Sequence, residues 1–125
     1  MDSSDNKTTD HVWYMRPVFF VADIRRSAEF YVDKLGFIKK WHEADGQGTV
    51  CQVDRGGCEI ILCQDASRCT PGRLFLELSK LGVEQLLHEV EERSVSATRT
   101  KWGYEVLNIK DPDGNELLIC LENLL

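Results

Sequence analysis

The side chains best suited to chemistry, three histidines and five cysteines, do not form a recognisable site in this 125-residue chain. The cysteines contain no C-x-x-C pair and leave one odd thiol, which argues against a disulfide framework and against a cysteine zinc site. His11, His42 and His88 have no chelating His or Glu at helical or alternating spacing. We therefore interpret the cysteines as apolar filler in a reducing compartment and the histidines as solvent-facing or packing residues.

Catalysis without a metal requires a nucleophile next to a base, or two carboxyl groups in different environments. No Ser-His-Asp or Cys-His spacing is present. The nearest acid–base candidate is Tyr104 with Glu105 or Glu116, which does not by itself carry a mechanism. The sequence therefore assigns no catalytic residue.

An internal repeat determines how the remaining residues are positioned. Residues 16–21 and 73–78 both alternate like strands, and they lie 57 positions apart. Residues 54–57 and 111–114 carry turn chemistry ahead of apolar strands, and they are again 57 apart. The constant offset indicates two ungapped copies in one register.

Each copy is predicted to form a strand, a helix and three strands. Asp23 and Ser79 are suitable caps for the two helices. The first copy has strands near 16–22, 37–43, 48–54 and 58–63 and a helix near 24–35; the second has strands near 73–78, 95–101, 103–110 and 115–121 and a helix near 80–93. The fold class is therefore α+β, with two tandem βαβββ modules that curve into a half-barrel cup.

The chain is expected to be one domain, because domains commonly have about 100–150 residues. We predict a flexible arm over 1–12 and a single domain over 13–125. Within the domain, module one covers 16–63, a linker covers 64–72 and module two covers 73–121.

Alternation divides each sheet into a back that packs under a helix and a mixed front. Phe19 and Leu76 belong to the backs. The fronts carry two arginines, two phenylalanines, two glutamates and two aliphatic residues: Arg16, Arg73, Phe20, Phe75, Glu59, Glu116, Ile61 and Leu118. Two fronts curling toward each other would enclose a cavity, which is where a function is expected.

The overall charge excludes one class of partner. A net charge of −6 opposes binding to a phosphate backbone, whereas it suits a cationic ligand or simple solubility. No apolar run approaches the roughly 20 residues that span a bilayer. Residues 1–10 are polar and acidic and do not resemble a secretory signal. We expect a cytoplasmic protein that does not bind nucleic acid or membranes.

Several motifs together resemble the vicinal-oxygen-chelate superfamily of glyoxalases, extradiol dioxygenases and bleomycin-resistance proteins. They are Val21-Ala22-Asp23-Ile24, Phe30-Tyr31, Leu35-Gly36-Phe37 and Asp111-Pro112-Asp113-Gly114-Asn115. Lys101-Trp102-Gly103-Tyr104 is most similar to the bleomycin-resistance branch. That resemblance implies a cytoplasmic homodimer, without metal or other cofactor, that stacks a cationic drug on aromatic side chains at the subunit interface.

The resemblance also allows a test for a metal. Enzymes of this superfamily hold a divalent ion at four positions, which in this chain are Arg16, Ile61, Arg73 and Leu118. A guanidinium has no lone pair to donate and an aliphatic side chain offers no ligand atom. All four positions fail, so we expect no metal.

The candidate ligand-binding residues combine aromatic and charged side chains of the two fronts: Trp41, Trp102, Tyr104, Phe20, Phe75, Arg16, Arg73, Glu59 and Glu116. The arginines either form structural ion pairs with front-face glutamates or grip an anionic group of the ligand. The tryptophans are either a stacking platform or lining and dimer contacts. The predicted function is to sequester a flat, cationic ligand such as a bleomycin-type antibiotic. The alternatives are a metal-dependent lyase, isomerase or dioxygenase, and a ligand-sensing module.

Overall fold

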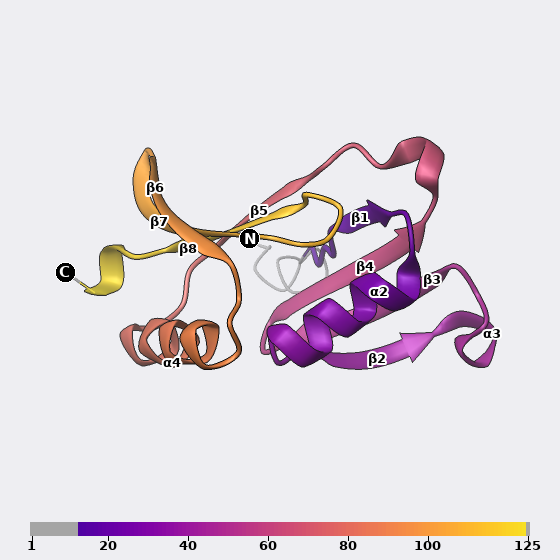
Figure 1. Ribbon diagram of the computed structural model, residues 1–125, viewed down its shortest axis with the longest axis horizontal. Coiled ribbons are helices and arrows are strands. Elements are labelled where there is room, and N and C mark those ends of the chain that lie inside the picture. The colour runs from indigo at the N-terminus through magenta and orange to yellow at the C-terminus, as the bar shows by residue number, and fades with distance from the viewer. Residues whose placement is uncertain (1–12, 125) are drawn as a thin grey trace, which may run out of the picture.

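Two four-stranded sheets, each with its own helix, make up the computed structural model, which describes residues 13–124 (Figure 1). The expected arm over 1–12 lies outside these residues. The first sheet has the order β1-β4-β3-β2 and the second has the order β5-β8-β7-β6, so the α+β fold and the repeated module are confirmed. Module one contains β1 (Val18–Val21), α2 (Ile24–Glu29), a π-helical turn (Phe30–Lys34), β2 (Ile38–His42), α3 (Glu43–Gly46), β3 (Val50–Arg55) and β4 (Cys58–Gln64); module two contains β5 (Arg73–Leu76), α4 (Lys80–Glu92), β6 (Ala97–Trp102), β7 (Tyr104–Lys110) and β8 (Glu116–Cys120). Single 3-10 turns cover Ala66–Arg68 and Glu122–Leu124.

The strand register confirms the offset of 57 in the parallel strand pairs but not in the antiparallel pairs. In the parallel pairs, Val18 lies opposite Ile61 and Phe75 lies opposite Leu118, which preserves the offset of 57. In the antiparallel pairs, however, Ile61 faces Gln52 whereas Leu118 faces Asn108. The expectation of ungapped copies is therefore wrong for the third strand. The turn over 111–115 holds one residue more than the turn over 55–58, and it shifts β7 by one position relative to β3.

Side-chain caps explain where the two helices begin. The Asp23 carboxylate accepts hydrogen bonds from the backbone N–H groups of Arg25 and Arg26, and the Ser79 hydroxyl accepts one from Gly82. The helix expected over 24–35 is not uniform, because it widens into the π-helical turn over 30–34. Gly36 follows with φ +71°, in the left-handed region that glycine tolerates, and it ends the helical segment.

A single hydrophobic core joins the two modules. Its largest fully buried members include Tyr31, Ile60 and Leu62 from module one and Ile109 and Ile119 from module two. Tyr31 comes from the π-helical turn, and the other four lie on the backs of the sheets, on the side of the helices, as the alternation predicts. The fronts of both sheets are consequently on the opposite side from the core.

The loop over 111–115 fastens module two to module one. The Tyr31 hydroxyl donates a hydrogen bond to Asp111 Oδ2 at 2.9 Å, and the Ala22 N–H and the Ser27 hydroxyl each donate to the Asp113 carboxylate at 3.0 Å. Asp111 also accepts bonds from the backbone N–H groups of Asp113 and Asn115. Burial, followed by the nearby Asp111 charge, raises the pKa of Tyr31. The motif that carries the family resemblance therefore has a structural role here.

Candidate functional site

Three aromatic side chains form an exposed cluster on the front of module two. The ring centroids of Phe75 and Tyr104 are 5.0 Å apart, and those of Phe75 and Trp102 are 5.8 Å apart. Trp102 and Tyr104 are paired across the β6–β7 hairpin, and they remain 46% and 50% exposed. The structure thus brings together three of the residues that the sequence analysis proposed: two from the β6–β7 hairpin and one from β5, which lies beyond β8 in the same sheet.

The ion pair of Arg73 lies beside this cluster. Its Nε and Nη2 atoms donate to Glu116 Oε1 at 2.9 and 2.7 Å, and its guanidinium stacks over the Trp102 ring at 5.5 Å. Asn108 Nδ2 donates to the other oxygen of Glu116 at 2.8 Å. Hydrogen bonds from Asn108 and then Arg73 lower the pKa of Glu116. For Arg73, the structural alternative left open by the sequence is the one observed.

The front of module one is arranged around a buried glutamine that the sequence analysis missed. Gln52 is 3% exposed, and its Oε1 atom accepts hydrogen bonds from Arg16 Nη1 and Trp41 Nε1, both at 2.9 Å. Its Nε2 atom donates to Asp54 at 2.9 Å and to Glu59 at 3.3 Å. The only sequence signal for Gln52 is a polar residue alternating with Cys51 and Val53 in an otherwise apolar strand.

Arg16 and Glu59 differ from their counterparts in module two. Among the ion pairs of residues 13–124, none joins Arg16 to a carboxylate, so for Arg16 the ion-pair alternative is not the one observed. Arg16 instead stacks over the Tyr14 ring at 5.4 Å, and the Tyr14 hydroxyl donates to Glu59. Arg16 and Glu59 therefore meet only through Gln52 and Tyr14.

The remaining front-face residues form a partly buried surface. Phe20 is half-buried, with the Arg68 guanidinium over its ring at 5.8 Å. Val106, Leu118 and Cys120 are buried, although none of them belongs to the main core cluster. They share the face of Phe75 and form an apolar floor beside the aromatic cluster.

The residues at the superfamily's four metal positions do not fit a metal. Arg16 and Arg73 carry guanidinium groups, and Ile61 and Leu118 are aliphatic, so the set supplies no donor atom. Within residues 13–124, no group of three or more His, Cys, Asp or Glu side chains is placed to hold an ion.

The fronts combine exposed aromatic side chains with buried ones such as Val106 and Leu118, and the cavity expected between the two fronts stays a prediction. The two cavities that we describe are lined by other residues. One lies between the modules on the side of the helices, and the other lies between α2 and the β2–α3 segment. No helix in the described part of the chain is long and apolar enough to cross a membrane.

Comparisons with known proteins agree with the fold. The family model described as "Glyoxalase superfamily protein" matches residues 3–123. No curated protein sequence matches the chain. A solved virulence protein from Salmonella typhimurium is 26% identical, with a TM-score of 0.61 over 86% of this chain and 95% of that one.

Two further solved structures share the fold at lower identity. A lactoylglutathione lyase from Agrobacterium tumefaciens is 16% identical, with a TM-score of 0.66 over 88% of this chain and 94% of that one. A bleomycin-binding protein, solved in complex with bleomycin, is 18% identical, with a TM-score of 0.67 over 87% of this chain and 98% of that one. The family model covers nearly the whole sequence, and the repeated module matches both structures. The chain therefore belongs to the glyoxalase superfamily, also called the vicinal-oxygen-chelate superfamily.

Proposed function

We propose that this protein is a metal-free binding protein that sequesters a flat, cationic small molecule, such as a bleomycin-type antibiotic, on the fronts of its sheets. The observation that carries the proposal is the exposed cluster of Phe75, Trp102 and Tyr104. Aromatic side chains held rigidly at a surface offer large stacking areas at a small entropic cost. The solved bleomycin-binding neighbour, with its bound drug, is consistent with this use of the fold.

The charge of the front of module one favours a cationic ligand. Asp54 and Glu59 lie directly opposite each other in the β3–β4 register, and like charges in such positions repel. The amide of Gln52 bridges them without neutralising either one. A ligand cation placed beside this pair would relieve the repulsion, and the net charge of −6 would attract it from a distance.

We propose further that a second copy of the chain completes the cleft. Val18, Ile38 and Trp41 on module one are 47%, 63% and 39% exposed, and the aromatic cluster on module two is also open. Such surfaces lose unfavourable contact with water when a partner covers them. Light scattering coupled to gel filtration tests this directly. A dimer is expected, and a monomer at micromolar concentration would remove the shared cleft.

Calorimetric titration with bleomycin tests the binding function. We expect Trp102→Ala to weaken binding at least tenfold, because the stacking surface is removed, while Trp102→Phe retains most of the affinity. Equal affinity of wild type and Trp102→Ala would remove Trp102 from the site. Absence of any heat at micromolar drug would favour the ligand-sensing alternative.

An enzyme of the lyase type is the second candidate, because a lactoylglutathione lyase shares the fold. Elemental analysis of the purified protein, and assay of the hemithioacetal of methylglyoxal and glutathione with added divalent metals, separate the two candidates. One bound metal per chain, or turnover that depends on metal, would replace the binding proposal. Neither is expected from the residues at Arg16, Ile61, Arg73 and Leu118.

A further inference from the structure

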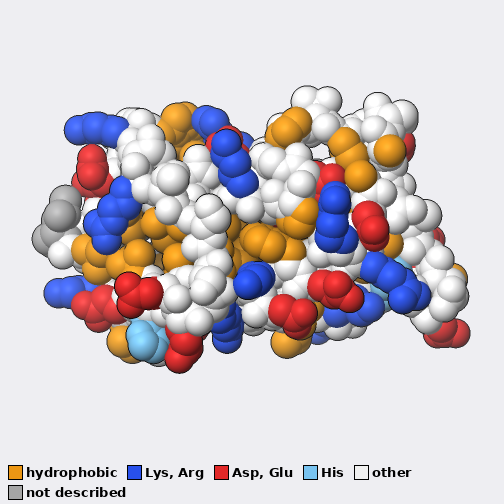
Figure 2. All heavy atoms as spheres, viewed as in Figure 1, with side chains coloured by type: hydrophobic (Ala, Val, Ile, Leu, Met, Phe, Trp, Pro, Cys, Tyr) orange, Lys and Arg blue, Asp and Glu red, His pale blue; other side chains and the backbone are white. Residues whose placement is uncertain are grey.

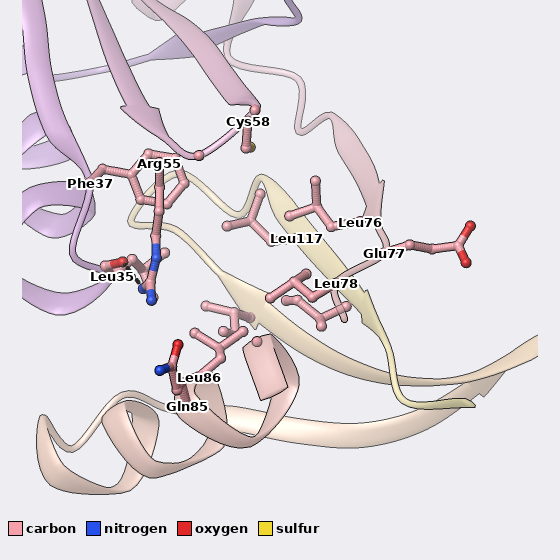
Figure 3. Close-up of a pocket in the computed structure, with 15 residues that line it drawn as sticks. Leu35, Phe37, Arg55, Cys58, Leu76, Glu77, Leu78, Gln85, Leu86 and Leu117 are labelled. Carbon is pink, nitrogen blue, oxygen red and sulfur yellow. Dashed lines mark hydrogen bonds between the residues drawn. The ribbon is translucent and has the colours of Figure 1, made fainter. Parts of the chain in front are cut away.

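A cavity of about 500 Å³ lies between the modules, on the opposite side of the sheets from the aromatic cluster. The β3–β4 hairpin of module one closes one side, α4 closes another, and β7 and β8 form the floor (Figure 3). In Figure 2, hydrophobic side chains gather on this face between α4 and module one, with charged side chains around them. None of the ligand-binding residues that the sequence analysis proposed lines this cavity.

The walls of the cavity are apolar. Phe37 and Leu86 are 6% and 8% exposed, and Leu117 and Ile119 on the floor are almost fully buried. Phe37, Leu76, Leu86 and Leu117 extend toward the same space in Figure 3. The volume falls within the range of small-molecule pockets, and water gains little from apolar walls of this kind. An apolar ligand body would therefore be favoured over water.

The polar groups at the rim are mostly satisfied. Arg55 donates to both carboxylate oxygens of Glu89 at 2.7 and 3.1 Å, and also to the backbone oxygen of Leu35 at 2.6 Å. Arg55 and Glu89 neutralise each other, and Arg93, which also pairs with Glu89 at 3.5 Å, is not among the lining residues. Glu77 points away from the cavity (Figure 3). Gln85, on α4, has no hydrogen-bond partner among residues 13–124, so its amide is available to a ligand.

Besides the charged Arg55 and Glu77, the lining contains the Cys58 thiol, which is neutral. Burial, followed by the charge of Asp54, raises the pKa of the Cys58 thiol to about 11, so the thiol is protonated at physiological pH. The interior therefore offers no counter-ion to a charged ligand, and Arg55 would have to leave Glu89 to provide one. Transfer of an ion into such surroundings is costly, whereas a neutral head group at the rim is not.

We propose that this cavity is a second binding site, which takes a neutral amphiphile: an aliphatic or single-ring body between Phe37, Leu86 and Leu117, with a hydroxyl or amide head at Gln85. The site is independent of the aromatic cluster. A ligand here would contact both modules, through the hairpin and α4.

1-Octanol and octanoate are suitable probes because they share a chain and differ in the charge of the head group. We expect 1-octanol to bind with submillimolar affinity in an NMR titration and to shift the methyl signals of Leu86 and Leu117. At pH 8, octanoate should bind at least tenfold more weakly. Equal affinity for the two probes would contradict the proposed preference for a neutral head group. Shifts confined to Phe75, Trp102 and Tyr104 would contradict the proposal that the cavity is a separate site.

Two exposed positions on α4 provide matched variants that spare the core. Gln85→Trp places a large ring at the rim and should weaken 1-octanol binding at least fivefold, whereas Glu84→Trp, on the same helix but outside the lining, should leave it unchanged. Bound 1-octanol should also slow alkylation of Cys58 by N-ethylmaleimide, read by peptide mass spectrometry, and leave the rate at Cys69 unaltered. Unchanged binding in Gln85→Trp together with unchanged Cys58 labelling would overturn the proposal.

Discussion

An arginine, a glutamate and an amide side chain lie on the front of each module, yet they are connected differently. In module two, Arg73 bonds directly to Glu116, which Asn108 also holds. In module one, Arg16 is connected to Glu59 only through other side chains. The carbonyl oxygen of Gln52 accepts a hydrogen bond from Arg16, and its amide donates one to Glu59. Gln52 is one methylene longer than Asn108, and that length lets it lie between the two charges. Module two therefore holds a neutral ion pair, Arg73 with Glu116, whereas module one holds an acidic pair, Asp54 with Glu59, that no cation neutralises among the described residues.

The turns that precede β4 and β8 also differ, both in length and in the contacts that they make. The short turn over 55–58 has two glycines at its centre, whereas the longer loop over 111–115 folds back on module one and buries Asp111. The longer loop thus supplies polar links between the halves, through Asp111 and Asp113.

Asp111→Ala should have the largest effect on stability, about 3–5 kcal/mol, because it leaves the Tyr31 hydroxyl and two backbone N–H groups buried without a partner. Urea unfolding measures it. The matched change at the other turn, Asp54→Ala, should cost less than about 1 kcal/mol, since it also removes the repulsion with Glu59. Equal losses in the two variants would show that the turns are equivalent.

Gln52→Leu should destabilise the protein by about 2 kcal/mol more than Asn108→Leu. The first change leaves the Arg16 and Trp41 donors without their acceptor and Asp54 and Glu59 without their bridge. The second removes an amide oxygen that is buried with no partner in the described residues, which offsets the loss of the bond to Glu116. Chemical unfolding of the two variants, compared at pH 7, decides it. A similar cost for both would contradict the difference between the two networks.

The smallest expected effect is at low pH. Because the folded state holds the pKa of Glu116 below its ordinary value of 4.5, its contribution to stability is complete above that pH and is lost as the pH falls through the lowered value. Glu116→Gln should therefore flatten the decline of stability below pH 4.5. Asn108→Leu should raise the pKa of Glu116 in an NMR titration, and an unchanged pKa would remove Asn108 as its main cause.

The repeat made the fold predictable, because strand alternation, helix caps and turn residues all recur at a nearly constant offset. The aromatic cluster was also predictable, since Phe75, Trp102 and Tyr104 follow from alternation and the β6–β7 hairpin. What the sequence did not reveal was the partner of each charged residue. Hydrogen bonds such as those of Gln52 depend on side-chain length and on a one-residue register shift. The two turns both carry aspartate and glycine, so their sequences did not indicate that shift.

The cavity between the modules was likewise absent from the sequence reasoning. Its lining comes from the hairpin tip, α4 and the floor of the second sheet, and each residue there reads as ordinary core or turn. Only the packing of one module against the other leaves that space unfilled, and no local pattern records how two modules meet.

The link between Tyr31 and Asp111 spans 80 positions of the chain. A nascent chain leaving the ribosome presents its first helix long before the loop that anchors it has been synthesised. Part of the apolar surface of module one therefore stays uncovered until the loop over 111–115 has emerged. Translation that pauses before residue 111 would prolong that exposed stage and increase the demand for chaperones.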